Sequence, residues 1–451
     1  MNVETAIEPQ GLLREAAAPA PEKSLKETPY WWDDLVPLER RSGALPRAVD
    51  VAVVGAGYTG LSAALQTARG GRKTLVFDAE SAGWGCSTRN GGQISTSVKP
   101  TFEELARRHG KERARAIRQE GTAALDWIES FVEREGIDCD FRRSGRFHAA
   151  HTPRHYEALV KSIQRQENGE NTEAFAVPRQ EQRRELGTDV YHGGVVFPKH
   201  ASLHPAKFHR DLLSRVLNAG GQIMDHTPVL NIERYDKGFT LTTPKGTLAA
   251  RDVIVATNGY TDKLTPWLRR RVIPIGSYVI ATEPLERSLV EQLFPTDRIV
   301  SDTCRVVYYY RASPDRSRII FGGRVSARET DPKVSGPLLK AELGLRFPEL
   351  RDVGMTHSWV GTVAYSFDQI AHTGIHDGIH YAMGYCGSGV SMASYLGMRM
   401  GLRVLGRAEG KTGFDELPFP TRPLYSGSPW FLPAVVAWYR WRDRREQHFA
   451  V

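Results

Sequence analysis

The sequence predicts a mixed α/β fold, in which a parallel sheet flanked by helices is joined to an inserted α+β domain built on an antiparallel sheet. First, an apolar, β-branched run ending at Val54 leads through a glycine-rich turn into a helix-forming segment, which is typical of a βαβ unit. Second, residues 251–259 are mostly apolar, as expected for a central parallel strand covered on both faces. Third, residues 272–330 contain successive strands without long helices, which indicates a separate antiparallel layer.

The composition is that of a globular protein large enough for two domains with cores of their own. The chain has 451 residues, of which 41% are hydrophobic and 25% are charged. Its net charge of +8 favours anions as ligands without identifying one. Basic residues cluster within 107–118, but glutamates share that predicted helix, so we expect a solvated face and no nucleic-acid partner.

Cysteine spacing and hydropathy indicate the compartment. Cys86, Cys139, Cys304 and Cys386 form no C-x-x-C pair, so the sequence predicts neither a metal site nor a disulfide framework, and it fits a reducing, cytoplasmic compartment. No run of about 18 apolar residues occurs and the N-terminus lacks a signal-peptide pattern, so we expect no transmembrane segment. The sequence indicates no particular oligomeric state.

Residues 50–60, DVAVVGAGYTG, are predicted to form a strand, a tight turn and the start of a helix. Gly55 permits the turn, Gly57 lets the backbone approach a pyrophosphate, and Gly60 lets the helix pack closely against the strand. The helix N-terminus offers unpaired amides and its positive dipole end to the phosphates. A second strand then delivers Asp78, whose carboxylate can accept hydrogen bonds from ribose hydroxyls. This pattern favours a dinucleotide site of the Rossmann type over a glycine-rich turn in another βα unit.

A second glycine-rich segment, GWGCSTRNGGQ at residues 83–93, follows Asp78. Its four glycines and small polar residues predict a loop that offers backbone amides and the Arg89 guanidinium to a bulky polar ligand. An ordinary surface loop is the alternative. Because a loop after the second strand of a dinucleotide domain lies at the carboxyl edge of the sheet, we expect it to contact the same ligand.

Hydrophobic periodicity predicts the remaining elements in chain order. The aromatic run at residues 30–32 is expected to pin the lead-in segment onto the folded body. The expected helices lie within 102–135, 156–166, 206–219, 390–405 and 430–441, and the expected strands at 141–151, 194–197, 222–224, 229–232, 240–248, 278–282, 306–310, 318–324 and 378–383. The last of these strands enters a second glycine turn at residues 384–389.

The predicted domain boundaries follow from these elements. Residues 1–28 lack a hydrophobic period and are expected to form a disordered tail. The dinucleotide-binding domain is expected at residues 29–100, 191–270 and 346–410, the inserted substrate domain at 101–190 and 271–345, and a C-terminal extension at 411–451.

Taken in order, these motifs resemble the D-amino-acid-oxidase-type (DAO) superfamily of FAD-dependent amine oxidoreductases, and within it the γ-glutamylputrescine oxidoreductase-like branch. The resemblance covers roughly residues 29–410. It implies an α/β FAD-binding Rossmann-type domain of the glutathione-reductase-like kind, with an inserted α+β substrate domain on an antiparallel sheet. The segments that carry it are Tyr30–Trp32, Gly55–Leu61, Ser87–Gln93, Ala256–Tyr260, Phe321–Arg324, Trp359–Gly361 and Gly384–Val390.

The resemblance also assigns roles along FAD. The first glycine turn would serve the pyrophosphate, Asp78 the adenosine ribose, and the Val229 backbone the adenine. Residues 89–93 would run beside the pyrophosphate and flavin ring, while the second glycine turn would cradle the flavin at a helix N-terminus. The residues expected to contact FAD are Gly55, Ala56, Gly57, Tyr58, Thr59, Gly60, Asp78, Ala79, Gly85, Cys86, Ser87, Arg89, Asn90, Gly91, Gly92, Gln93, Val229, Thr257, Asn258, Gly259, Gly384, Gly387, Ser388, Gly389 and Val390.

The resemblance implies that FAD is held without a covalent bond. Some relatives link flavin through a cysteine just before the position of Tyr365, where this chain has Val363 and Ala364. Another group uses a histidine in the loop that spans Ser87–Gln93 here and contains none. A link through Cys386, in the second glycine turn, stays open.

The implied reaction is oxidation of the C–N bond of a small-molecule amine or amino-acid derivative by hydride transfer to flavin, after which the imine hydrolyses. Tyr365, His372 and Arg324 are the candidate catalytic residues, each with a structural role as the alternative. Arg324 would bind a substrate carboxylate or place positive charge near the flavin, unless it is a salt-bridged arginine at a strand end. Oxygen is the default electron acceptor, giving H2O2.

Other functions fit the same motifs. An N-methyl, cyclic or D-amino-acid dehydrogenase would pass electrons to a quinone or carrier protein, and a non-catalytic FAD-binding or tRNA-modifying subunit would oxidise no amine. An NAD-dependent dehydrogenase is a further alternative. Because the second glycine turn lacks a following strand that ends in an acid, we expect reduction by the substrate itself rather than by NAD(P)H.

Overall fold

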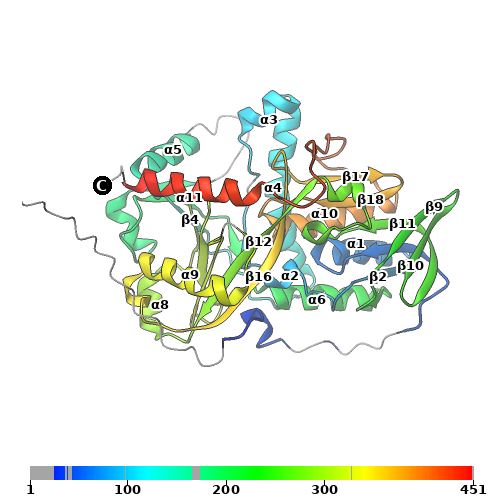
Figure 1. Ribbon diagram of the computed structural model, residues 1–451, viewed down its shortest axis with the longest axis horizontal. Helices are drawn as coiled ribbons and strands as arrows, with labels where there is room; N and C mark the ends of the chain where they lie inside the picture. The colour runs from blue at the N-terminus through cyan, green and yellow to red at the C-terminus, as the bar shows by residue number, and fades with distance from the viewer. Residues whose placement is uncertain are drawn as a thin grey trace, which may run out of the picture.

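The computed structural model describes residues 25–35, 38, 43–96, 98–164, 173–326 and 328–448, so most of the predicted tail at residues 1–28 lies outside the described residues. These residues form two eight-stranded sheets and a two-stranded one, with helices packed against the large sheets (Figure 1). No helix in these ranges is both long and apolar enough to cross a membrane. The predicted combination of a parallel layer and a second, largely antiparallel layer is confirmed.

The first sheet contains the predicted parallel layer. Its order is β17-β18-β11-β1-β2-β8, and a meander of β9 and β10 is paired onto β11. All neighbours from β18 to β8 run parallel, and β17 is antiparallel at the edge. The strands are β1 (Ala48–Val54), β2 (Thr74–Phe77), β8 (Gln222–Met224), β9 (Asn231–Tyr235), β10 (Gly238–Thr243), β11 (Gly246–Val255), β17 (His372–His376) and β18 (Ile379–Met383).

Both faces of β1 are covered, which explains its continuous apolar sequence. Val51 and Val53 point into the core formed with the helices, and Ala52 and Val54 point into the core on the opposite face. Val54 pairs with the last residues of β2 and β11, so three carboxyl ends meet at one edge of the sheet. This edge is where ligands bind in open α/β sheets.

Five helices form the layer on one face of the first sheet: α1 (Tyr58–Arg69), α3 (Phe102–His109), α4 (Lys111–Arg134), α6 (Pro205–Asn218) and α10 (Gly389–Val404). Small residues let α1 and α10 touch, since a Cβ added at Gly397 would lie 2.3 Å from Thr59 O. The helices α3 and α4 share this core. They therefore belong with the first sheet, whereas the predicted boundary at residue 101 assigns them to the substrate domain.

The second sheet has the order β16-β12-β15-β14-β13-β4-β6-β5. It is antiparallel except that β4 and β13 run parallel. Both β6 and β16 belong to it, although the predicted boundaries place their residues in the dinucleotide-binding segments; pairing with distant strands decides their layer. Its strands are β4 (Arg146–Ala149), β5 (Phe175–Val177), β6 (Gly194–Phe197), β12 (Val272–Thr282), β13 (Ile299–Asp302), β14 (Tyr309–Ala312), β15 (Ile319–Gly323) and β16 (Met355–Ser366).

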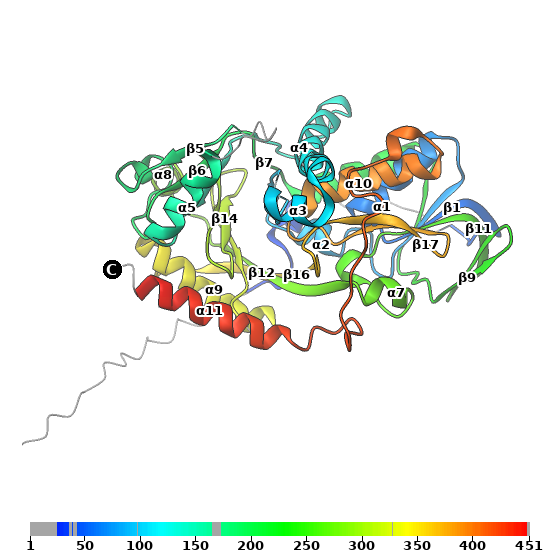
Figure 2. The same ribbon diagram turned by 90° about the horizontal axis from the view of Figure 1, so that it is seen from above.

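The remaining elements lie around the two large sheets and between them. Trp31 of the aromatic run is fully buried, and its Nε1 donates to Asn90 O at 2.8 Å, as the predicted pinning requires. The C-terminal helix α11 (Leu432–His448) runs along the second-sheet half of the molecule (Figure 2). The others are α2 (Cys86–Arg89), α5 (Pro153–Gln164), α7 (Pro266–Arg269), α8 (Arg287–Leu293), α9 (Pro332–Arg346), β3 (Gln93–Ile94), β7 (Ala201–Ser202) and the 3-10 helices η1 (Tyr30–Trp32), η2 (Arg179–Arg184), η3 (Asn258–Tyr260), η4 (Pro348–Leu350) and η5 (Ala408–Gly410).

Candidate functional site

A single cavity of about 1640 Å³ is lined by residues of both sheets. Its volume exceeds the roughly 300–1,000 Å³ usual for a small-molecule pocket, which leaves room for a dinucleotide and a second ligand. The predicted residues in its lining are Gly55, Gly57, Tyr58, Thr59, Asp78, Ala79, Gly85, Cys86, Ser87, Arg89, Asn90, Gly91, Gln93, Val229, Thr257, Asn258, Arg324, Tyr365, Gly387, Ser388, Gly389 and Val390.

The first glycine turn has the close contacts that its sequence predicts. Gly55 has φ +106°, a conformation that other residues rarely adopt. A Cβ at Gly60 would lie 1.8 Å from Gly55 O, so only glycine lets α1 start this close to β1. Asp78 accepts from the Ala56 N–H at 2.8 Å, and burial raises the pKa of its carboxyl. Asp78, the residue predicted to bind the ribose, is therefore hydrogen-bonded to the first glycine turn at one end of the cavity.

Aromatic side chains hold the loop that contains Arg89. The Arg89 guanidinium lies 4.8 Å from the ring centroids of both Trp32 and Trp84, and its Nε donates to Trp84 O at 2.6 Å. From the second sheet, Trp359 Nε1 donates to Arg89 O at 2.8 Å. Burial lowers the pKa of Arg89. These contacts fix the loop backbone against the cavity without an opposing carboxylate.

The second glycine turn is joined to the end of β11. Gly384 and Gly387 have φ of +76° and +94°, and Cys386 between them has φ +52°. The Gly384 N–H donates to Asn258 Oδ1 at 2.9 Å, which connects the second glycine turn to the segment 256–260 that follows β11. The turn ends at Ser388, the N-cap of α10. Two helix N-termini, of α1 and α10, therefore face one cavity and favour negative charge there.

The two cysteines nearest this site differ in their position. Cys86 lies in the cavity lining, and burial raises the pKa of its thiol to about 12. Cys386 lies outside that lining, and its Sγ donates to Gly384 O at 3.1 Å. Burial raises the pKa of Cys386 as well. Neither environment favours the thiolate that nucleophilic attack requires.

The second sheet forms the wall opposite the turns. Of the run Tyr308–Tyr310, Tyr309 faces the cavity, whereas Tyr308 and Tyr310 point into the core of the second sheet. A Cβ at Gly91 would lie 2.8 Å from the Tyr309 ring, and the Tyr309 hydroxyl is 2.8 Å from Ser277 Oγ. Tyr365 also lines the cavity, and a Cβ at Gly387 would lie 3.5 Å from its hydroxyl. Because side chains alternate between the two faces of a strand, Tyr309 lines the cavity while its two neighbours pack in the core.

Arg324 reaches the cavity but carries its own counter-ion. Its Nη1 donates to Glu329 Oε1 at 2.8 Å and to Gly276 O at 2.9 Å. The same carboxylate accepts from the Tyr278 hydroxyl at 2.8 Å. Burial opposes the ionisation of Glu329, but the Arg324 guanidinium holds its pKa below the usual value. The salt-bridged alternative for Arg324 is therefore the arrangement observed.

His372 is not brought to the cavity. Its ring stacks on Phe419 at a centroid distance of 4.0 Å, and its Nε2 lies 3.0 Å from Asp368 Oδ1. The side chain is 1% exposed and lies outside the cavity lining. We therefore assign His372 a packing role and withdraw it as a candidate catalytic residue; the sequence did not reveal the aromatic partner, which is 47 positions later in the chain.

Two other residues predicted to contact FAD, Gly92 and Gly259, lie outside the cavity lining, where they allow segments of backbone to pack closely. Gly92 and Gly259 allow close approach, since a Cβ would lie 2.2 Å from Leu203 O and 2.8 Å from Thr362 O, respectively. His209, which the sequence analysis did not name, donates from Nε2 to Ala56 O at 2.7 Å. It lies on α6, 153 positions after the turn, and no local motif marks it.

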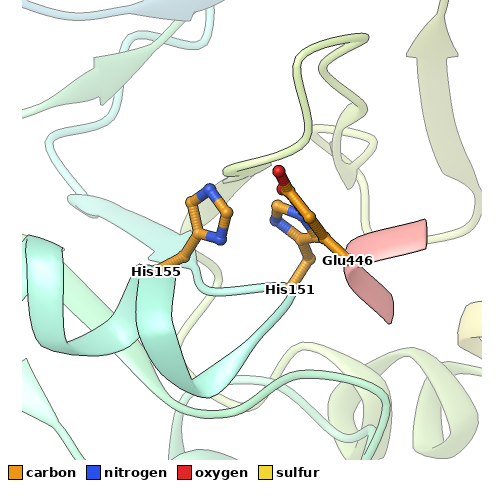
Figure 3. A group of neighbouring side chains, drawn as sticks. All are labelled: His151, His155 and Glu446. Carbon is orange, nitrogen blue, oxygen red and sulfur yellow. Dashed lines mark ion pairs between the residues drawn. The ribbon is translucent and has the colours of Figure 1, made fainter. Parts of the chain in front are cut away.

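The C-terminal helix α11 closes one side of the cavity, with Leu432, Val436 and Tyr439 in the lining. Arg305 anchors it by donating to both oxygens of Glu446 at 2.8 Å. His151 and His155 approach the same carboxylate (Figure 3), and the three ligand atoms lie within 4.8 Å of one another. Because the Arg305 guanidinium already neutralises Glu446, a metal ion would have to displace it. We interpret the cluster as an anchor for α11.

Comparisons with known proteins agree with this arrangement. A model of the family described as FAD dependent oxidoreductase (DAO) matches residues 50–401. The chain is 31% identical to gamma-glutamylputrescine oxidoreductase of Escherichia coli (strain K12) over 400 residues, 88% of this chain and 93% of that protein. It is 30% identical to the probable oxidoreductase OrdL of Rhizobium meliloti (strain 1021), over 92% of this chain and 97% of that protein.

A solved structure shows the same fold. The crystal structure of glycine oxidase from Geobacillus kaustophilus aligns with a TM-score of 0.68 at 18% identity, over 84% of this chain and 99% of that one. The predicted fold class and the predicted cofactor are confirmed, and the glycine turns, the acidic strand end and the two helix N-termini fit FAD. This chain is a member of the DAO family of FAD-dependent oxidoreductases.

Proposed function

We propose that this protein is an oxidase that breaks a C–H bond next to the nitrogen of an amine or amino-acid derivative. The observation that carries the proposal is the continuity of the cavity. It runs from the first glycine turn and Asp78 to Tyr309 and Tyr365 on the second sheet, so a dinucleotide and an amine can share it. FAD, when bound, would accept the hydride and hold the electron pair.

The chain's own contribution is to bind, orient and exclude water. Leu432 and Val436 of α11 cover one side of the cavity and limit solvent. Tyr309 and Tyr365 offer hydroxyl groups from the opposite wall, with which the amine can be oriented. His148, also in the lining, is neutral near pH 7 because burial lowers its pKa to about 4, so it adds no positive charge that would repel an amine. A neutral amine needs no strong base at its carbon.

The product and the acceptor follow from this assignment. The imine would hydrolyse to an aldehyde or keto acid and an amine, and oxygen would take the electron pair and two protons to give H2O2. A quinone or carrier protein in place of oxygen would make the protein a dehydrogenase. Its similarity to gamma-glutamylputrescine oxidoreductase favours a long amine of that type as substrate.

An anaerobic titration tests the proposal. FAD-loaded protein is mixed with γ-glutamylputrescine, putrescine, sarcosine, proline or glycine, and bleaching of the flavin absorption band is recorded. We expect bleaching by the long amine, followed by recovery of the band and formation of H2O2 when air is admitted. A flavin that stays oxidised with every amine would contradict amine oxidation. Recovery with a quinone but not with air would replace the oxidase by a dehydrogenase.

A further inference from the structure

Arg146 is the first residue of β4, and its side chain forms part of the cavity wall. No hydrogen bond or ion pair to it is found within the described parts of the chain, and its Nε is buried without a partner. Burial alone lowers the pKa of Arg146 to about 10, and no carboxylate offsets that effect. Because a desolvated cation without a counter-ion is costly, such a side chain is typical of a site that receives an anion.

The other arginines in the same cavity have partners. Arg324 pairs with Glu329, Arg305 pairs with Asp443 and Glu446, and Arg442 also pairs with Glu446. Arg118 donates to the carbonyl oxygens of Val98 and Pro100, and Arg89 lies against two tryptophan rings. Arg146 differs from these five, although it shares their cavity. The structure therefore distinguishes the arginines that are held by protein groups from Arg146; the cavity also contains the cation of Lys99, whose Nζ lies 5.9 Å from the centroid of the Tyr365 ring.

Sheet register gives the distance of Arg146 from the flavin side of the cavity. His148 on β4 is the neighbour of Ser301 on β13, which pairs with Tyr309 on β14, so these three side chains share one face. Arg146 lies two residues from His148 on that same face. Two strand spacings amount to about 10 Å, and two residues along a strand to about 7 Å. Arg146 is thus well separated from Tyr309, which packs over Gly91 in the loop expected beside the flavin.

The groups around Arg146 add hydrogen-bond donors without adding charge. His148 and His200 line the same arm of the cavity, and burial lowers the pKa of both, so they are neutral near pH 7 and can donate one N–H each. Ser301, 2.9 Å from His148 Nδ1, adds a hydroxyl. Arginine is the residue best suited to a planar carboxylate, which it can bind through two parallel hydrogen bonds.

We propose that Arg146 binds a carboxylate at the far end of the substrate, so that the protein selects long amines that carry an anionic group remote from the oxidised carbon. This inference rests on the proposed amine oxidation and adds the substrate class. It moves the role of carboxylate ligand from Arg324 to Arg146. Amino acids such as glycine, whose carboxylate adjoins the amine-bearing carbon, cannot span the distance between Tyr309 and Arg146.

The test uses two matched amines, N-glutarylputrescine and its methyl ester, which differ in one charge. In FAD-loaded wild-type protein, the acid should half-saturate flavin bleaching at a concentration about 10- to 100-fold lower than the ester, the range of a charge-assisted hydrogen bond. Arg146→Met should abolish this preference by weakening the acid alone, and Arg146→Lys should retain part of it. Equal weakening of acid and ester, or no change in either, would overturn the proposal.

Two controls exclude a structural or cofactor role. Arg154→Met removes an exposed arginine from the neighbouring helix α5 and should leave the preference intact. Without ligand, Arg146→Met should melt at a higher temperature than the wild type, because it removes an uncompensated charge, whereas loss of a structural arginine would lower the melting temperature. Loss of flavin from Arg146→Met would show that the residue serves the cofactor and would overturn the proposal.

Binding without turnover separates this inference from the proposed function. Glutarate should raise the melting temperature of the FAD-loaded wild type and not that of Arg146→Met. If no amine bleaches the flavin but glutarate binding depends on Arg146, amine oxidation fails and the anion site stands. If amines bleach the flavin but glutarate leaves the wild-type melting temperature unchanged, the anion site fails and amine oxidation stands.

Discussion

At its nucleotide end the cavity is bounded by backbone from short, contiguous turns, whereas at its substrate end it is bounded by side chains from strands far apart in the sequence. Gly55, Gly57 and Gly60 lie within six residues of one another and act because they lack side chains. Arg146 and Tyr309 come from strands separated by more than 150 residues and act through their functional groups. At Gly55 and Gly60 an added Cβ would collide with backbone, while a site made of side chains can be altered one contact at a time.

The charges of the two ends differ in the same way. Apart from the Asp78 carboxyl, the nucleotide end offers partial charges of helix termini and amides, which are fixed by the fold. The substrate end carries full charges, of which Arg324 is neutralised by Glu329 and Arg146 is not. The following variants test this comparison, beginning with the largest expected effect.

Gly57→Asp should abolish FAD retention. An added Cβ would lie 2.8 Å from Ser87 Oγ, a movable side chain, so the fold can adjust, but a carboxylate would then face the pyrophosphate at the helix N-terminus. The measurement is the ratio of flavin to protein absorbance after purification. Gly43→Asp is the matched control, because a Cβ at Gly43 meets no described atom within 4 Å. Full flavin loading in Gly57→Asp would contradict the assignment of this turn.

Glu329→Gln should destabilise the protein by about 1–2 kcal/mol and remove the counter-ion of Arg324. Removal of one partner from a buried pair costs about 3–5 kcal/mol, and the estimate is lower here because the Glu329 side chain is 56% exposed. Urea unfolding gives the stability change, and glutarate binding should strengthen because the charge of Arg324 is no longer neutralised by a carboxylate. Glu291→Gln, which breaks the exposed pair with Arg287, should cost less than about 0.5 kcal/mol. Equal losses in both variants would remove the distinction between Arg324 and Arg146.

His148→Gln should reduce the loss of stability on acidification by about 1 kcal/mol. Burial lowers the pKa of His148 to about 4, below the value of about 6.5 in the unfolded chain. The unfolded state therefore binds a proton first, and stability that is fully present above pH 6.5 is lost as the pH falls towards 4. Urea unfolding at pH 7.5 and 5.5 measures the difference, with the exposed His226→Asn as control. Parallel losses in wild type and His148→Gln would show that His148 is accessible to protons.

Cys386→Ser should leave flavin content unchanged, and acid precipitation should release the flavin from both wild type and variant. The Cys386 sulfur is turned to Gly384 O, outside the cavity lining. Cys86→Ser serves as the comparison, since Cys86 lies in the lining. Colour that stays with the wild-type pellet and leaves it in Cys386→Ser would demonstrate a covalent link at the less exposed of the two thiols.

The sequence predicted the elements of this molecule better than their grouping. The strand at β1, the two glycine turns and the helix α10 lie close to the predicted positions, because local turn chemistry and apolar runs specify them. The layer to which α3, α4, β6 and β16 belong was predicted differently, because partner strands and helices are chosen by contacts across the chain. Domain boundaries that rest on chain order alone cannot include such contacts.

The candidate site shows the same division. Gly55, Asp78 and Gly387, which the sequence predicts as contacts of FAD, all lie in the cavity lining, because a dinucleotide site imposes fixed spacings on a turn and a strand end. His372 was misplaced and Arg146 was missed, because the sequence around each gives no sign of what faces it. Arg324 and Arg146 both line the cavity, but Glu329 neutralises Arg324, whereas no carboxylate in the described parts of the chain pairs with Arg146.

By itself the sequence determined that the chain has a dinucleotide turn, a second glycine turn and a strand-rich insertion, since glycine spacing and hydrophobic period act over a few residues. The tertiary structure decided which tyrosine faces the cavity, which arginine is neutralised and which helix covers the opening. Those features depend on strand register, on the path of the loop that brings Glu329 back to Arg324, and on contacts between segments more than a hundred residues apart. Burial and charge pairing are properties of the assembled fold, so no local pattern in the chain records them.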